Sequence, residues 1–94
     1  MIRKMKFEWD PTKAASNMRK HGVSFEEAMT AFKDELCATA RDLDHSMAEY
    51  RFITFGLSAD GRLLTVSHTG RGSTIRIISA RLITRAERKI YEEG

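Results

Sequence analysis

Two arginines in the most strand-like stretch of the chain are the first candidates for chemistry. Residues 74–81 read Thr-Ile-Arg-Ile-Ile-Ser-Ala-Arg, a run rich in β-branched residues that follows a glycine turn. Because charged side chains are rarely buried without partners, Arg76 and Arg81 require an internal carboxylate or an anionic ligand. The internal alternative is a salt bridge to Glu49 or Asp44. We favour a phosphate clamp for Arg76, whereas both interpretations stay open for Arg81.

The spacing of these two arginines sets a geometric condition on a shared site. Successive side chains of a strand alternate between its two faces, and Arg76 and Arg81 have opposite parity. They can share a face only if a β-bulge lies between them, for which Ser79-Ala80 is the expected place, or if Arg81 sits at the strand end.

Acid–base chemistry has one candidate within the strands. Because the ordinary pKa of a histidine is near neutrality, His68 could be a general acid or base, although a lone strand histidine is more often structural. The three histidines are scattered and Cys37 is the single cysteine, so no metal-binding spacing occurs. We therefore expect no cofactor and chemistry by Arg, His and Glu.

The charge distribution predicts a polyanionic partner or internal neutralisation. The net charge is +3, but residues 26–49 hold seven acidic and two basic residues, whereas residues 62–89 hold seven basic residues and one acidic residue. Folding of the acidic segment over the basic one is as compatible with this pattern as a polyanion. Six of the seven basic residues are arginines, which favours bidentate phosphate contacts.

Capping signals and periodicity predict the elements that hold these residues. Asp10-Pro11 begins a helix that Gly22 ends, and the capping boxes Ser24–Glu27 and Thr84–Glu87 begin two more. Ala14, Ala15 and Met18 are expected to face inward from the first helix, Phe25, Ala28, Met29 and Phe32 from the second, and Ala86, Ile90 and Tyr91 from the last. Alternation and β-branched content predict strands at residues 6–9, 36–41, 49–55, 62–69 and 74–81.

These elements predict an α+β fold with the order β-α-α-β-β-β-β-α and a single domain over residues 1–94. We expect an antiparallel sheet with helices on one face, so that the other face is open to solvent or a partner. No apolar run is long enough for a membrane span, and one cysteine fits a reducing cytoplasm, which is the expected location.

Several separated motifs together resemble one protein family. They are Lys20-His21-Gly22-Val23-Ser24-Phe25-Glu26-Glu27-Ala28, Asp44-His45-Ser46 with Glu49 and Arg51, residues 75–81, and Thr84, Glu87 and Tyr91. In this order they resemble the BrnT toxins over nearly the whole chain, from Phe7 to Glu93.

The resemblance implies a RelE-like fold and a ribonuclease toxin of a type II toxin–antitoxin system that stops translation. The implied partner is a BrnA-like antitoxin with a ribbon-helix-helix DNA-binding part, and the complex would bind operator DNA and repress its own operon. A homodimer and a 2:2 heterotetramer both stay open. The resemblance carries over Glu49, Arg51, Arg76 and Arg81 as active-site candidates, and His68 is added on chemical grounds.

The chemistry of RNA fits this interpretation. The 2′-hydroxyl is a built-in nucleophile, so arginines need only stabilise the charged phosphorane, with Glu49 and His68 as base and acid in either order. The remaining basic residues would hold the RNA backbone: Arg62, Arg71, Arg85, Arg88 and Lys89. The alternatives are a non-catalytic nucleic-acid- or antitoxin-binding module acting in operon autoregulation, and a structural protein with neutralised arginines.

Overall fold

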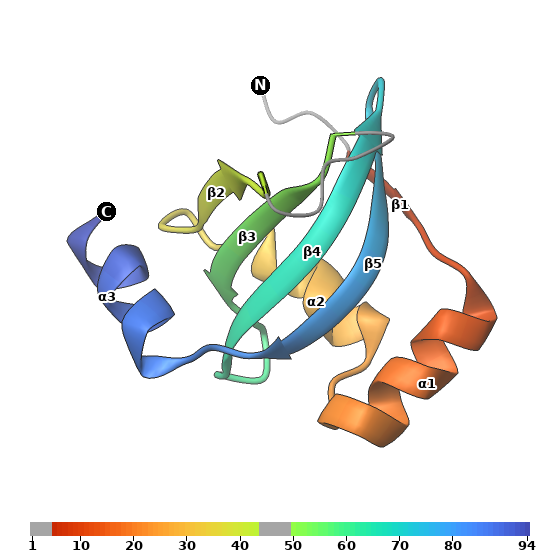
Figure 1. The fold of residues 1–94 in the computed structure, drawn as a ribbon, viewed down its shortest axis with the longest axis horizontal. Coiled ribbons are helices and arrows are strands. Elements are labelled where there is room, and N and C mark those ends of the chain that lie inside the picture. Colours follow the sequence, from red (N-terminus) through yellow and green to blue (C-terminus); the bar gives the residue numbers. More distant parts are fainter. Residues whose placement is uncertain (1–4, 44–49) are drawn as a thin grey trace.

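The computed structural model describes residues 5–43 and 50–94, without the side chain of Arg71. The elements are β1 (Lys6–Glu8), α1 (Pro11–His21), α2 (Phe25–Ala31), β2 (Ala38–Arg41), β3 (Phe52–Leu57), β4 (Leu63–Arg71), β5 (Thr74–Leu82) and α3 (Arg85–Glu93). Their order confirms the predicted α+β succession β-α-α-β-β-β-β-α (Figure 1). None of the helices in the described part of the chain is long and apolar enough to cross a membrane.

Local capping chemistry places the helix ends where the sequence predicts them. The Asp10 side chain accepts a hydrogen bond from the Thr12 N–H at 2.8 Å, and Gly22 ends α1 with a left-handed φ of 68°. Thr84 and Glu87 form a complete capping box at α3. At α2 only half of the predicted box forms, because Ser24 accepts from the Glu27 N–H while the Glu27 carboxylate binds Arg62 and Ser58.

The described residues form a five-stranded sheet in the order β1-β5-β4-β3-β2. Antiparallel pairing is confirmed from β2 to β5, but β1 pairs with β5 in parallel, so the expectation of a wholly antiparallel sheet is wrong at this edge. The reason is the connection: the chain passes through both helices and three strands before β5 lies beside β1, so no hairpin turn reverses it.

One face of the sheet carries the core. Leu64, Val66, Ile77 and Ala80 are buried against α1 and α2, and Phe25 is fully buried with them. Figure 1 shows α2 behind the strands. Strict alternation would place Ile77 and Ala80 on opposite faces of the sheet. A β-bulge keeps them on one face, because Ser67 pairs with Ser79 but the next residue, His68, pairs with Ile77, so that Ile78 is an extra residue in β5.

The sequence predicts that Arg76 and Arg81 can share a face if a bulge lies between them. The structure confirms this bulge, at Ile78 rather than at Ser79-Ala80. On β4 the partner of Arg76 is Thr69 and the partner of Arg81 is Thr65. Thr65 and Thr69 have the parity opposite to the core residues Leu64 and Val66. Arg76 and Arg81 therefore lie together on the face turned away from α1 and α2.

The last helix lies on that second face, which corrects the expectation that the helices cover one face only. Glu87 of α3 accepts hydrogen bonds from Thr65 and Arg81, and Tyr91 donates to Asp34 at 2.7 Å. Of the three predicted inward residues, Tyr91 is partly buried as predicted, whereas Ala86 and Ile90 are exposed. The contacts to the sheet turn Glu87 inward in their place.

The most buried residue of α1 is polar rather than apolar. Of the predicted inward residues, Ala14 packs against the core, whereas Ala15 and Met18 are exposed, and the buried position is Asn17. Its amide donates to the carbonyls of Val23 at 2.9 Å and Ala80 at 2.8 Å, and it accepts from the Ala80 N–H at 3.1 Å. The side chain thus joins α1 to β5 through hydrogen bonds that a hydrophobic stripe could not provide.

Candidate functional site

A row of polar side chains crosses the second face of the sheet and includes two predicted site residues. Thr69 pairs with Arg76, and Arg76 pairs with Glu8 of β1. Phe52 pairs with His68, so the same register continued by one residue places Arg51 opposite Thr69. The Asp42 N–H donates to the Arg51 carbonyl at 2.8 Å, which extends the neighbouring β2–β3 ladder to this residue. The order across the sheet is Arg51, Thr69, Arg76, Glu8.

The row places Thr69 between two arginines. Arg51 and Arg76 lie on strands separated by β4, which places their backbones about 10 Å apart. Long arginine side chains converge easily across this distance. The next row towards α3 contains Ser67 and Ser79, both half-buried. The arrangement is therefore cationic and rich in hydrogen-bond donors, as a phosphate site requires.

Arg76 is held by a surface ion pair. Its Nη1 lies 3.0 Å from Glu8 Oε2, and the two side chains are 40% and 43% exposed. A pair of this exposure contributes about 0–1 kcal/mol, so the guanidinium can exchange its carboxylate for another anion at small cost. Asp44 and Glu49, the carboxylates of the internal alternative, lie outside the described residues.

Thr69 carries an unsatisfied hydroxyl. The residue is 2% exposed, and its Oγ1 has no hydrogen-bond partner within the described structure. An unpaired buried hydroxyl costs about 1–3 kcal/mol. The other buried threonines of the sheet are satisfied: Thr54 lies 2.7 Å from Thr39 and 2.8 Å from His68, and Thr65 donates to Glu87 at 2.9 Å.

Arg81 shares the face but is engaged in a bidentate ion pair. Its Nη1 and Nη2 each lie 2.8 Å from one oxygen of Glu87. The Arg81 guanidinium, with the Thr84 N–H and the Thr65 hydroxyl, lowers the pKa of Glu87 to about 2. The internal alternative for Arg81 is therefore realised, with Glu87 as its carboxylate, and its guanidinium holds α3.

His68 does not join the arginines. It lies on the face covered by α1 and α2 and is 6% exposed. Its Nε2 is 2.8 Å from Thr54 Oγ1, and its ring packs against Phe32 and Phe52. Burial lowers the pKa of His68 to about 4. The geometry supports the structural interpretation, because the sheet itself separates this imidazole from Arg76.

Among the residues expected to hold RNA, Arg62 is engaged in contacts within the fold. Its Nε donates to Glu27 Oε2 at 3.0 Å and its Nη2 to the Gly22 carbonyl at 3.1 Å, and a second, short contact joins it to Glu27 Oε1. Hydrogen bonds from Arg62, followed by one from Ser58, hold the pKa of Glu27 below its ordinary value despite burial. These contacts tie the β3–β4 turn to the helices.

The remaining predicted RNA contacts lie at different places. Arg85, Arg88 and Lys89 are exposed on α3, and Arg88 Nε donates to Glu92 at 3.3 Å. The side chain of Arg71 lies outside the described part of the structure.

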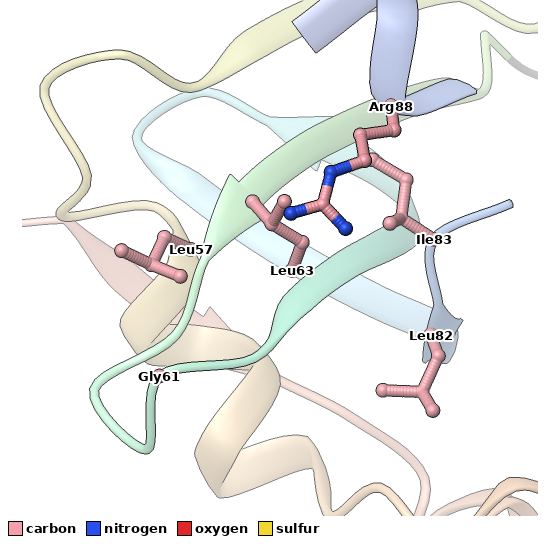
Figure 2. A pocket seen from close by; sticks show the side chains of 6 residues that line it. All are labelled: Leu57, Gly61, Leu63, Leu82, Ile83 and Arg88. Carbon is pink, nitrogen blue, oxygen red and sulfur yellow. The ribbon is translucent and has the colours of Figure 1, made fainter. Parts of the chain in front are cut away.

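A hollow between α3 and the β3–β4 turn is lined mainly by apolar side chains. Figure 2 shows Arg88 reaching over Leu63 and Ile83, with Leu57, Leu82 and Gly61 completing the wall. Thr69 is six residues from Leu63 on β4, so this hollow is about 20 Å along the strand from the arginine row. With Arg88 as its charged group, the hollow offers no general acid or base.

No group of three His, Cys, Asp or Glu side chains that could hold a metal ion occurs in the described ranges 5–43 and 50–94.

Sequence reasoning missed Glu8 and Thr69 as members of the row. A signal for Thr69 exists: the two-residue turn Gly72-Ser73 fixes the pairing of Arg71 with Thr74 and hence of Thr69 with Arg76.

Comparisons with known proteins agree with this architecture. A family model described as the ribonuclease toxin BrnT of type II toxin–antitoxin systems matches residues 9–87. The chain is also similar to the crystal structure of the Brucella abortus ribonuclease toxin BrnT, with 25% identity, a TM-score of 0.65, and coverage of 87% of this chain and 100% of that one. Among curated proteins, none matches the chain. Because the family model spans most of its length, the chain belongs to the BrnT family of ribonuclease toxins of type II toxin–antitoxin systems.

Proposed function

We propose that this ribonuclease toxin cleaves RNA on the second face of its sheet, at the row formed by Arg51, Thr69 and Arg76, without a metal ion. One observation carries the placement: the bulge at Ile78 brings Arg76 onto the same face as Arg51. Family membership supplies the reaction class, and the row supplies the cationic groups that this reaction needs.

The reaction begins with the 2′-hydroxyl of the RNA, which attacks the neighbouring phosphorus. The bond from phosphorus to the 5′-oxygen breaks, and the products carry a 2′,3′-cyclic phosphate and a 5′-hydroxyl. A base removes the proton of the nucleophile, and the leaving 5′-oxygen takes up a proton. Arg51 and Arg76 stabilise the extra negative charge on the phosphorane, where fixed cationic donors contribute most.

Two carboxylates are candidates for the base. Glu49, two residues before Arg51, is one of the two acid–base candidates that the sequence predicts, the other being His68. Glu8 lies in the row itself, 3.0 Å from Arg76, and is half exposed. Separate E8Q and E49Q variants distinguish them, because the loss of the base lowers kcat at constant RNA affinity. We assign Arg81 to the docking of α3 and His68 to the core.

Binding of the RNA backbone is proposed for cations on either side of the row along the strands. Arg85, Arg88 and Lys89 are exposed on α3, towards one end of β4, and Arg71 ends β4 at the other. Each phosphate neutralised by such a side chain releases counterions, so RNA affinity falls as salt concentration rises. Arg62 is left out of this set because Glu27 and Gly22 already hold it.

In the cell, we propose that cleavage stops translation in the cytoplasm and that a BrnA-like antitoxin with a ribbon-helix-helix part neutralises the toxin. Operator DNA is reached only through the toxin–antitoxin complex. Expression with and without the neighbouring small open reading frame tests this assignment. Growth arrest that the neighbouring protein does not relieve would contradict it.

The decisive experiment measures cleavage of a defined RNA by purified protein in EDTA. We expect cleavage by the wild-type chain, a loss of at least about 100-fold in R76A, and little change in R19A. Arg19 is an exposed arginine on α1, on the other side of the sheet, so R19A controls for the loss of one positive charge. RNA that binds but stays intact with every metal ion tested would favour the non-catalytic binding module.

A further inference from the structure

The second face holds one buried hydroxyl, that of Thr69, for which the described part of the fold provides no hydrogen-bond partner. Thr69 is 2% exposed and its Oγ1 is without a hydrogen-bond partner in the described part of the molecule. Thr65 lies on the same strand and face with the same exposure, and its hydroxyl donates to Glu87. Buried polar groups are almost always paired, so Thr69 calls for an explanation beyond packing.

The position of this hydroxyl indicates its missing partner. Arg76 is directly opposite on β5, and the continued register places Arg51 opposite on the β3 side. Directly opposed residues have Cβ atoms about 4.5–5.5 Å apart. The partner that two guanidinium groups attract is an anion with several acceptor oxygens, and a phosphodiester offers two non-bridging oxygens.

We propose that Thr69 is a substrate-contacting residue whose hydroxyl donates to a non-bridging oxygen of the RNA phosphodiester held between Arg51 and Arg76. This inference rests on the proposed function and adds a residue to it. The hydroxyl is shielded in the free protein, so the contact forms when the neighbouring side chains move onto the phosphate. The half-exposed Arg76–Glu8 pair allows such a movement.

The exchange of Thr69 for valine tests the inference, because valine keeps the shape and removes the hydroxyl. If Thr69 has a purely structural role, T69V should be as stable as the wild type or more stable, and its cleavage rate should be unchanged. If Thr69 contacts the substrate, T69V should have the same stability, but its kcat/KM should be lowered about 10- to 100-fold. T69S, which retains the hydroxyl, should recover most of the rate.

T65V is the matched control. It removes a paired hydroxyl at the same exposure, so it should lower the melting temperature while T69V does not. If T69V fails to fold, the pair T69S and T69A decides: equal rates for the two overturn the inference, and a tenfold advantage of T69S supports it.

A phosphorothioate RNA gives a readout that a structural role would not move. Sulfur at the contacted oxygen should slow the wild-type enzyme and have a smaller additional effect on T69V, because the hydrogen bond is already absent. Equal thio effects in both proteins would overturn the inference. Wild-type protein without any RNA cleavage would instead refute the proposed function, so the two failures are distinguishable.

Discussion

Replacement of Glu87 by glutamine should loosen α3 from the sheet. The Glu87 carboxylate accepts hydrogen bonds from both Arg81 nitrogens, the Thr65 hydroxyl and the Thr84 N–H, at 2.8–3.0 Å. A glutamine has the same size, but it lacks the charge and points an amide N–H₂ group at one of these donors. The substitution therefore removes the ion pair and part of the capping box together.

The size of the effect follows from the pKa of Glu87, which Arg81 lowers from 4.5 to about 2. A shift of this size corresponds to at most about 3 kcal/mol of stabilisation at neutral pH. Because Arg81 is 39% exposed, solvent screening reduces the contribution to about 1–2 kcal/mol. For a domain of this length that is a decrease in melting temperature of roughly 4–15 °C.

The pH dependence provides a second measurement with a defined sign. A carboxyl with a lowered folded-state pKa stabilises the fold above its unfolded pKa of 4.5 and loses this contribution as the pH falls towards 2. The stability difference between wild type and E87Q should therefore shrink from about pH 5 downward. Urea unfolding at pH 7, 5 and 3 measures it.

The control is E92Q on the same helix. Glu92 pairs with Arg88 at 3.3 Å, but both side chains are more than half exposed, so E92Q should cost less than about 0.5 kcal/mol. The anchoring of α3 by Glu87 would be refuted if E87Q had the wild-type melting temperature at pH 7. It would also be refuted if the difference in unfolding free energy between wild type and E87Q did not change with pH.

Three further substitutions test the packing around the site by urea unfolding. In G56A the new Cβ would lie 2.6 Å from the Ala31 carbonyl, so α2 must shift and we expect a loss of about 1–3 kcal/mol; wild-type stability would contradict this contact. N17A leaves the Ala80 backbone unpaired and should cost about 2–4 kcal/mol, against little change for exposed S16A. Burial lowers the pKa of His68 from its ordinary 6.5 to about 4, so the free energy of unfolding should fall as the pH drops from 6.5 to 4. If H68Q shows the same pH dependence, His68 is not its source.

The elements that sequence reasoning placed correctly depend on contacts between near neighbours. Asp10 caps α1 through Thr12, and Thr84 caps α3 through Glu87 three residues on. Alternation and β-branched content fixed the four strands after the helices to within a few residues. Such signals act over one turn of helix or one strand pair, so a single sequence contains them.

The errors arise where one side chain serves distant parts of the chain. Glu27 is placed to complete a capping box, yet Arg62, 35 residues away, takes its carboxylate. Asn17 looks like a surface residue, but it binds the backbone of Ala80, 63 residues on. Amphipathic periodicity also assigns an inward side to α3 without stating which face of the sheet it meets, and this choice decides the state of Arg81.

The bulge at Ile78 explains why two similar arginines have different partners. Without the extra residue, Arg76 would face the core beneath α1 and α2, on the face opposite to Arg81. With it, Arg76 and Arg81 share a face but lie opposite Thr69 and Thr65, about 13 Å apart along β4. Glu87 reaches only the second position. Loss of Arg81 should therefore act through stability and loss of Arg76 through cleavage, a separation that residue type alone cannot predict.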